Sequence, residues 1–336
     1  MLTAVMKPSV DIRVIINPAS AARRTARRIP TVVASLESRF PHRCAFSLTQ
    51  GPGDAMRIAG EAVRDNSSLV VAVGGDGTFH EVANGMLRAT RGDVPSCPLG
   101  FISSGSGEGT ALSLRLPRSV DEQVRLIAEC PPRAIDVVAV STFTPSGERS
   151  YHFFINECQV GIGADVVRDC RRTKKAAGGL LGYGLATLSA IFRSPNADLS
   201  LAIDDGEEIS SNVLGLSIGN GDLTAGGMAL TPGAEPDDGV LNLLTIRGLT
   251  LTERLRSFPK IYSGAHIGTP GFGYRTVKKC RVSGPMPFPV TADGEMIGRL
   301  PCTISVLERA ILVIAPAHYG DKGYEHTTHR FAEERV

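Results

Sequence analysis

The chain has 336 residues, of which 42% are hydrophobic and 21% charged, and its formal net charge is +2. This length allows two domains with a sizeable core, and the near-neutral charge argues against a nucleic-acid partner. Seven scattered cysteines without a CxxC pair argue against a disulfide framework or a zinc site. The longest nearly uncharged apolar run, residues 180–192, is too short to span a bilayer. With no signal-peptide pattern at the start, we expect a cytoplasmic protein.

The first 136 residues alternate between strand and helix patterns. Buried-strand patterns cover residues 11–17, 44–49, 68–75 and 98–103, and helical patterns cover 22–39, 53–65 and 80–89. Strands that alternate with helices at this spacing form parallel sheets with both faces covered. The pattern therefore predicts a doubly wound α/β domain over residues 1–136.

From residue 137 onward, short β-rich runs separated by turn residues dominate. They cover residues 137–143, 151–160, 197–203, 212–220, 240–246, 278–284, 288–294 and 302–308. This texture predicts an antiparallel β-sandwich or barrel over residues 137–311. Two helical pieces interrupt it, an insertion at about 166–193 and a second at 251–264. We expect the last segment, 312–336, to return toward the first domain, because it carries most of the apolar run AILVIAP, residues 310–316.

The stretch VVAVGGDGTFHEVANG, residues 70–85, places an aspartate between glycines at the end of a predicted strand. Glycine allows positive φ and a close approach of the backbone to a ligand, and ligands bind at the carboxyl ends of parallel strands. Backbone N–H groups at the start of the next helix attract phosphate. Asp76 would then bind a magnesium ion or accept a proton from an attacking hydroxyl. The alternative is a tight turn in which Asp76 only caps the helix.

Motifs in the same order cover nearly the whole chain. They are INPASA (16–21), LTQGPGDA (48–55), GGDGTFHEVANG (74–85), PLGFISSGSGEGTA (98–111), FINECQVGIGADV (154–166), the glycine-rich stretch 219–244 and TADGE (291–295). This series resembles the diacylglycerol-kinase-like lipid kinases, which include sphingosine and ceramide kinases. NAD kinases share the GGDG turn but not the HEVANG continuation. The resemblance implies an NAD kinase/diacylglycerol kinase-like α/β domain followed by a β-sandwich that binds lipid.

The same resemblance implies an ATP- and Mg²⁺-dependent kinase that transfers the γ-phosphate to a hydroxyl of a membrane lipid. The second phosphate loop departs from the family pattern, because Ser103 replaces a proline and Glu108 an asparagine. Its Gly-Ser-Gly sequence at residues 105–107 is more like sphingosine and ceramide kinases. Together with HEVANG, it favours a sphingoid or ceramide-type acceptor, with diacylglycerol as the alternative. An NAD kinase-like enzyme and a catalytically dead lipid sensor are the remaining alternatives, and only the altered loop supports the sensor.

The resemblance also assigns nucleotide contacts. They fall on Asn17, Ser20, Thr49, Gly74, Gly75, Asp76, Gly77, Thr78, Glu81, Gly105, Ser106 and Gly107. Ordinary turn or cap chemistry is the alternative for Asn17 and Thr49. Glu81 could equally be a first-turn acid that the helix dipole favours.

Two further carboxylates follow one another at the end of the β-rich part. Asp293 and Glu295 are two residues apart, so an extended backbone would project both to the same side. We expect both to be catalytic beside ATP and Mg²⁺, one ordering the water shell of the metal and the other taking the proton from the lipid hydroxyl. The resemblance makes Glu295 the general base and Asp76 the residue that organises metal and phosphate, while the reverse assignment puts the base at Asp76. The alternative for the ADG stretch is a β-turn with solvated acids.

The acidic stretch AEPDDG, residues 234–239, is the second candidate metal site. By resemblance to bacterial family members, a structural magnesium would bind Asp238 and the backbone carbonyls of Val240 and Glu235, with waters completing the shell. An acid-rich turn without metal is the alternative.

The predicted insertion 166–193 joins a basic run to an apolar stretch. Such a segment suits anionic headgroups and acyl chains, so we expect peripheral contact with a membrane surface. A solvated charged face is the alternative. A homodimer through an exposed edge strand is also open.

Overall fold

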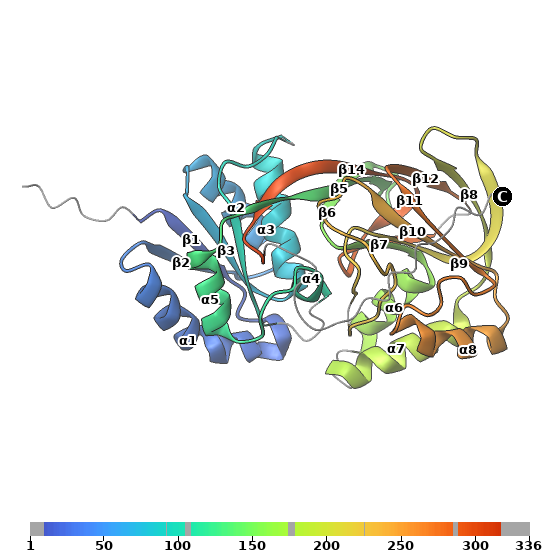
Figure 1. The fold of residues 1–336 in the computed structure, drawn as a ribbon, viewed down its shortest axis with the longest axis horizontal. Helices are drawn as coiled ribbons and strands as arrows, with labels where there is room; N and C mark the ends of the chain where they lie inside the picture. Colours follow the sequence, from blue (N-terminus) through green and yellow to red (C-terminus); the bar gives the residue numbers. More distant parts are fainter. Residues whose placement is uncertain are drawn as a thin grey trace, which may run out of the picture.

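The computed structural model describes residues 10–91, 93–104, 109–173, 179–224, 226–284 and 288–316. Figure 1 shows two bodies side by side, an α/β half and a β-rich half, connected by the long strands β5 (Arg133–Phe143) and β14 (Glu295–Val313). The predicted fold class, a doubly wound α/β domain followed by a β-sandwich-like domain, is confirmed.

The α/β half contains four parallel strands in the order β2-β1-β3-β4. They are β1 (Ile12–Ile16), β2 (Cys44–Leu48), β3 (Leu69–Gly74) and β4 (Leu99–Ser103). Helices α2 (Asp54–Arg64) and α3 (Asp76–Ala89) pack on one face, where Ile15, Val70 and Phe101 point. Helices α1 (Arg24–Arg39) and α5 (Val120–Glu129) pack on the other face, where Val14 and Val71 point. Alternate residues of each strand thus enter separate cores, as expected for a sheet covered on both faces.

The β-rich half is built from antiparallel pairs around a second core. Besides β5 and β14, its strands are β6 (Arg149–Phe154), β7 (Glu157–Gly161), β8 (Ala197–Ile203), β9 (Ile209–Gly219), β10 (Leu241–Arg247), β11 (Phe272–Val277), β12 (Lys279–Ser283) and β13 (Pro289–Ala292). The predicted run 151–160 divides into β6 and β7 around Ile155 and Asn156. Strand β11 had no counterpart among the predicted runs.

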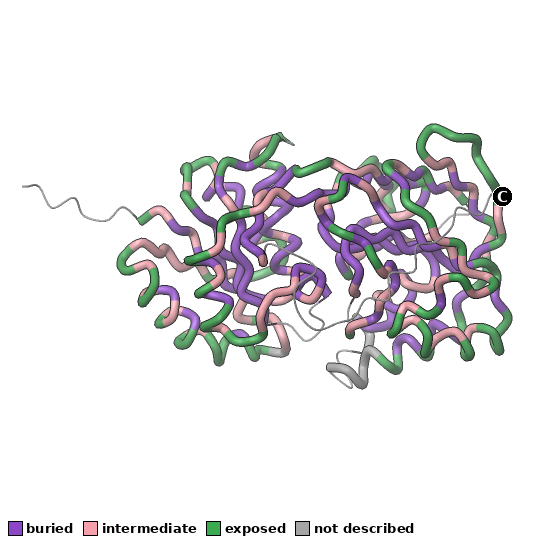
Figure 2. The backbone as a smooth tube through the Cα atoms, in the orientation of Figure 1, coloured by how far each residue is buried: buried purple, intermediate pink, exposed green. Residues whose placement is uncertain are grey.

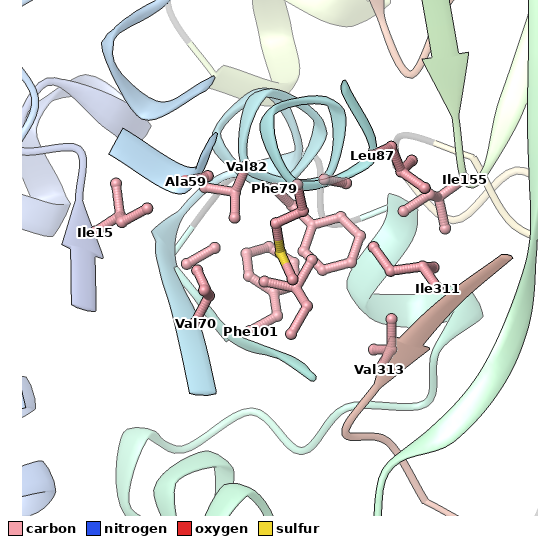
Figure 3. Close-up of a cluster of buried hydrophobic side chains, with 14 of the residues drawn as sticks. Ile15, Ala59, Val70, Phe79, Val82, Leu87, Phe101, Ile155, Ile311 and Val313 are labelled. Atoms are coloured by element: carbon pink, nitrogen blue, oxygen red, sulfur yellow. The ribbon is translucent and has the colours of Figure 1, made fainter. Parts of the chain in front are cut away.

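Strand β14 links the two halves. The sequence suggested two separate runs, 302–308 and 310–316, but residues 302–313 lie in one strand whose register shifts between Leu307 and Ile311. Its end pairs in parallel with β4 at Val313 and Leu99, and Ile314 N donates to Leu99 O at 2.9 Å. Ile311 and Val313 therefore pack into the same core as Phe79 and Phe101 (Figure 3). Residues 317–336 lie outside the described part.

Further helices complete the fold. They are η1 (Ser20–Arg23), α4 (Gly109–Ser113), α6 (Ile162–Thr173), α7 (Gly179–Arg193) and α8 (Leu251–Ile261). Figure 2 shows burial concentrated in the strands of both halves, with the outer sides of the helices exposed. Among the described residues, no helix is both long and apolar enough to cross a membrane.

Candidate active site

The GGDG turn joins the end of β3 to the start of α3. A Cβ atom on Gly74 would lie 2.4 Å from Thr78 Oγ1, so a larger residue there would displace the first turn of the helix. Gly75 is extended, with φ −98° and ψ −175°, and its carbonyl accepts from Thr78 N at 2.9 Å. Neither these two glycines nor Gly77 has positive φ. Gly74 is therefore needed for close approach to Thr78, and the positive φ suggested by the sequence is not used in this turn.

Asp76 is the first residue of α3, where the helix dipole favours a negative charge. Its Oδ2 atom accepts a hydrogen bond from Gly109 N, the first residue of α4, at 3.0 Å. This contact ties the GGDG turn to the end of the second glycine-rich loop. The predicted nucleotide contacts Gly105, Ser106 and Gly107, and the divergent Glu108, lie outside the described residues.

Three of the predicted nucleotide residues meet at the carboxyl ends of β1 and β3. Asn17 Nδ2 donates to Thr78 Oγ1 at 3.1 Å, and Asn17 Oδ1 accepts from Ala19 N at 3.1 Å. Ser20 Oγ donates to the carbonyl of Asn17 at 2.9 Å. Ser20 Oγ also lies 2.5 Å from Thr25 Oγ1. The buried hydroxyl of Thr25 is therefore part of this network, although the sequence did not single it out.

Thr49 and Glu81 lie at the neighbouring strand. Thr49 N donates to Ile16 O at 2.9 Å, directly after β2. Glu81 Oε1 accepts from Gly53 N, the N-cap residue of α2, at 3.0 Å. Glu81 thus reaches from its own helix to the start of the next one, a contact that neither sequence interpretation foresaw. Its effect is to hold the loop after Thr49 against α3.

The backbone at Asp293 and Gly294 is not extended. The expectation that Asp293 and Glu295 project to the same side assumed an extended backbone, so that assumption is wrong. Asp293 has φ 46° and Gly294 φ 76°, and their neighbours Ala292 and Glu295 are paired across β13 and β14. The two residues therefore form the loop of a two-residue hairpin. The turn of the alternative interpretation is present, but its acids are not both solvated, because the Asp293 side chain is only 2% exposed and Glu295 is half-buried.

Both carboxylate oxygens of Asp293 are occupied by donors of the protein. Oδ1 accepts from Asn156 N at 2.9 Å and Glu157 N at 3.1 Å. Oδ2 accepts from Ile155 N at 3.1 Å and lies 3.0 Å from His80 Nδ1. Asp293 therefore fixes the bend between β6 and β7 against α3, and we assign it a positioning role.

Replacing Asp293 with asparagine should be strongly destabilising. If the amide nitrogen replaces Oδ1, it faces two backbone N–H donors, and if it replaces Oδ2, it faces one backbone N–H and His80. In either case at least one buried donor loses its acceptor. We expect a loss of about 3 kcal/mol in the free energy of unfolding, measured by urea denaturation. Asp204→Asn is the matched control, because Asp204 is also an aspartate with positive φ, but it is exposed. One of its oxygens, Oδ1, accepts from both Lys278 N and Lys279 N. The amide oxygen of asparagine can keep both bonds. Equal losses in the two variants would contradict the assignment.

Glu295 is the first residue of β14 and follows the hairpin loop directly. A Cβ atom placed on Gly77 would lie 3.4 Å from Glu295 Oε1, so this carboxylate lies against the first turn of α3. Asp76 and Glu295 thus reach the same helix start from the two halves of the chain.

His80 and Asn84, which the HEVANG motif contains but the prediction did not assign, connect α3 to the β-rich half. His80 contacts Asp293, as described above. Asn84 Nδ2 donates to Phe153 O at 2.8 Å, and Asn84 Oδ1 accepts from Phe153 N at 3.0 Å. The spacing of four residues places both side chains on one face of the helix. This spacing was the signal in the sequence from which their shared contact surface could have been predicted. The motif therefore has a structural function at the junction of the two halves.

Glu157 is a buried glutamate that the sequence analysis also left unassigned. Burial raises the pKa of its carboxyl group to about 8, the hydrogen bond from Gln159 opposes the shift, and the negative charges of Asp293 and Asp76 add to it. Gln159 Nε2 donates to Glu157 Oε2 at 2.5 Å. The raised pKa favours the protonated carboxyl group at neutral pH.

This raised pKa predicts a pH dependence of stability. An unfolded glutamate has a pKa of about 4.3, so between that value and about 8 the native state binds more protons than the unfolded state. Glu157 therefore lowers stability as the pH rises through this window. In Glu157→Gln, the fall in unfolding free energy between pH 5 and 8 should be weaker, by up to about 1.4 kcal/mol per pH unit. Urea denaturation at several pH values, with exposed Glu207→Gln as control, measures this; identical slopes in wild type and Glu157→Gln would contradict it.

The second candidate metal site forms a turn against β5. Asp238 Oδ1 accepts from Val240 N at 3.0 Å. Burial raises the pKa of Asp238, the Val240 hydrogen bond opposes this, and the charges of Asp136, Glu235 and Asp237 raise it further. The turn thus brings Asp238, Glu235 and Val240 together in a region of excess negative charge. Among the described residues, no three His, Cys, Asp or Glu side chains form a metal-binding group, so backbone carbonyls or waters would have to complete any site.

A GGDG turn at the carboxyl end of an inner parallel strand, with a carboxylate from the β-rich half against it, is the architecture of a two-domain phosphotransferase. Family comparison agrees. Residues 11–140 match the diacylglycerol kinase catalytic domain, and residues 157–315 match the YegS C-terminal NAD kinase beta sandwich-like domain. The chain is 30% identical over 285 residues to a probable lipid kinase YegS-like protein of Chromohalobacter salexigens, covering 82% of this chain and 85% of that protein. The chain therefore belongs to the diacylglycerol-kinase-like family of lipid kinases.

A further relative carries a related name, and two solved structures share the fold. The chain is 27% identical over 305 residues to a diacylglycerol kinase of Staphylococcus carnosus, covering 90% of this chain and 94% of that protein. Its fold is similar to the crystal structure of a diacylglycerol kinase from Bacillus anthracis, with a TM-score of 0.74, 20% identity and coverage of 93% and 99%. A yeast NADH kinase shares the fold at a TM-score of 0.52 and 11% identity, covering 93% of this chain and 84% of that chain. These comparisons do not show the closer relation to sphingosine and ceramide kinases that the Gly-Ser-Gly loop suggested.

Proposed function

We propose that this protein is an ATP- and Mg²⁺-dependent lipid kinase that transfers the γ-phosphate to a hydroxyl group of diacylglycerol. The observation that carries the proposal is the position of Glu295, whose carboxylate comes from the β-rich half and lies against Gly77 of the GGDG turn. A general base must reach the reacting hydroxyl close to the bound phosphates, and the junction of the two halves offers that arrangement.

Each residue at the junction has a distinct role in this proposal. The close packing at Gly74 and the backbone N–H groups at the start of α3 suit the phosphates of ATP. Asp76 would hold the metal, and one or two carboxylates together with phosphate oxygens are the usual ligands of Mg²⁺. When bound, Mg²⁺ neutralises phosphate charge. Glu295 takes the proton of the lipid hydroxyl, and Asp293 holds the hairpin that carries Glu295.

Diacylglycerol replaces the sphingoid acceptor as the preferred substrate for two reasons. Relatives that align over most of this chain carry the name diacylglycerol kinase. The features that favoured a sphingoid acceptor are weaker supports, since Gly105–Gly107 lies outside the described residues and the HEVANG side chains His80 and Asn84 contact the protein itself. The described strands also offer antiparallel edges at β6 and β11, but no contact favours one of them, and we propose no dimer.

Transfer of labelled γ-phosphate from ATP to mixed micelles tests the proposed function. The acceptors are diacylglycerol, ceramide and sphingosine, with NAD as a soluble control. We expect label in diacylglycerol. Label in ceramide or sphingosine would restore the first acceptor hypothesis, whereas label in NAD alone would contradict a lipid kinase. Nucleotide binding without label in any acceptor would support the catalytically dead sensor.

We also propose that the turn of Glu235, Asp238 and Val240 binds a structural magnesium ion. Burial raises the pKa of Asp238 and the charges of Asp136, Glu235 and Asp237 add to it, so a bound cation would stabilise the charged carboxylate. At ten times its Kd the ion would stabilise the native state by about 1.4 kcal/mol. We expect magnesium, added without nucleotide, to raise the Tm of the wild type and of the control Asp205→Asn, which changes an exposed acid outside this turn. It should leave the Tm of Asp238→Asn unchanged, and an equal rise in that variant would contradict the site.

A further inference from the structure

Helices α7 and α8 carry an unusual share of the exposed apolar surface. Eleven large hydrophobic side chains are exposed among the described residues, and six of them belong to these two helices and their ends. They are Leu185, Leu188 and Phe192 of α7, and Leu251, Leu255 and Tyr262 of α8 and its C-cap, each between 42% and 56% exposed. We refer to these six residues as the apolar platform.

Helical spacing places each set of three on one stripe. Residues 185, 188 and 192 follow the spacing i, i+3, i+7, and residues 251, 255 and 262 fall within about 40° of one another around a helix of 3.6 residues per turn. The opposite face of α7 is also apolar, because Ala186 and Ala190 pack against Val166 and Cys170 of α6. A helix with apolar side chains on both faces needs an apolar partner on its outer side.

Arg254 holds the two helices together as one surface. It lies on α8, and its guanidinium donates to the carbonyls of Ile191 and Ser194 at the end of α7, at 3.0 and 2.7 Å. The same side chain donates to Leu249 O at 3.1 Å and Asn196 Oδ1 at 2.9 Å. Figure 1 shows α7 and α8 side by side along the lower edge of the β-rich half.

Helix α7 and the residue after it are also hydrogen-bonded to α6, the helix that follows β7. Ser189 Oγ donates to Asp169 Oδ2 at 3.0 Å, and Ser194 Oγ donates to Asp165 Oδ2 at 2.6 Å. Both aspartates belong to α6, which begins directly after β7 and packs on β7 and β13. These contacts connect the apolar platform to the strands that carry Glu157 and the Asp293 hairpin.

The charges around the apolar platform are mostly positive. Arg193, Arg256 and Lys260 are exposed on the two helices. The acid of α8, Glu253, uses its carboxylate in the capping box with Thr250. Basic residues that border an apolar surface suit anionic headgroups over acyl chains. A twofold contact between two copies of this surface would instead bring like charges together.

We propose that the apolar platform of α7 and α8 inserts into the surface of a lipid bilayer and that Arg193, Arg256 and Lys260 contact its anionic headgroups. This inference rests on the proposed function, since a kinase of membrane lipids must reach a bilayer. It refines the contact expected from residues 166–193 in two ways. It adds α8, which lies 58 residues or more beyond α7 in sequence, and it moves the emphasis from the basic run to an apolar surface. Arg168 of that run forms ion pairs with Asp165 and Asp169 at 2.7 and 3.2 Å, and residues 174–178 lie outside the described part.

Co-sedimentation with phosphatidylcholine vesicles, with and without added phosphatidylglycerol, tests the proposal. The variants are Leu188→Ser/Phe192→Ser on α7, Leu255→Ser/Tyr262→Ser on α8, and Arg256→Ala/Lys260→Ala for the charges. Ile209→Ser is the matched control, because Ile209 is 64% exposed on β9, outside the apolar platform. Unchanged Tm and unchanged affinity for ATP in each variant verify that the fold is intact.

Each apolar double variant should bind mixed vesicles at least about ten-fold more weakly than the wild type. The charge variant should lose affinity only for vesicles that contain phosphatidylglycerol, and salt should reduce this difference. Wild-type binding by both apolar variants, or no vesicle binding by the wild type, would overturn the proposal. So would a change in oligomeric mass with unchanged vesicle binding, which would assign the surface to a second copy of the chain. Vesicle binding without phosphorylation of any lipid would overturn the proposed function and leave this surface standing.

Discussion

Asp76→Asn should lower the rate of phosphoryl transfer on the order of 10³-fold while the fold is preserved. Asparagine can still accept the hydrogen bond that Gly109 N donates to Oδ2 at 3.0 Å, so the tie between the two loops survives. What is lost is the negative charge that would bind the metal. Single-turnover transfer of labelled phosphate to diacylglycerol, together with Tm, measures the two effects separately.

Asp54→Asn is the matched control for this prediction. Asp54 is the first residue of α2, as Asp76 is of α3, and it accepts from Gln50 N at 2.8 Å. The two substitutions therefore change the charge at the same position of neighbouring helices. Near-normal transfer in Asp76→Asn, or an equal loss in Asp54→Asn, would show that the charge at this helix position has no specific catalytic role.

Glu295→Gln should lower transfer by about 10²–10⁴-fold, the usual contribution of a positioned general base. The substitution keeps the size of the side chain against Gly77, where a Cβ atom would lie 3.4 Å from Oε1, but it removes the proton acceptor. Affinity for ATP should remain close to that of the wild type, because the nucleotide contacts assigned above lie in the α/β half. Calorimetry measures that affinity, and a large loss of ATP binding with little loss of transfer would instead assign Glu295 to the nucleotide site.

Local patterns predicted the α/β half well, because its strands and helices follow one another along the chain. Helix α5 was missed, although Ser119 accepts from Glu122 N at 3.2 Å as its N-cap. The serine followed three residues later by glutamate was a usable signal. The GGDG turn was located correctly, yet Gly74 serves close packing against Thr78, which cannot be read from conformational preference alone.

The β-rich half shows where sequence patterns were insufficient. We interpreted the ADG stretch as part of an extended strand, in which side chains alternate between two faces. Asp-Gly between two strands is instead a hairpin signal, and the structure forms the hairpin. Strand β14 was divided into two runs because its register shift at Leu307–Ile311 interrupts the pattern. The contacts of Asp293 with residues 155–157 join positions more than 130 residues apart, and no local pattern specifies such pairs.

In the proposed function, Asp76 and Glu295, one from each half of the chain, act on the same phosphoryl transfer. A double-mutant cycle tests it most directly, using single-turnover transfer of labelled γ-phosphate to diacylglycerol by wild type, Asp76→Asn, Glu295→Gln and the double variant. Residues that act as a unit are strongly non-additive, so we predict a double variant about as slow as the slower single variant. Losses that multiply fully would contradict the claim, because they would mean that the two carboxylates act independently.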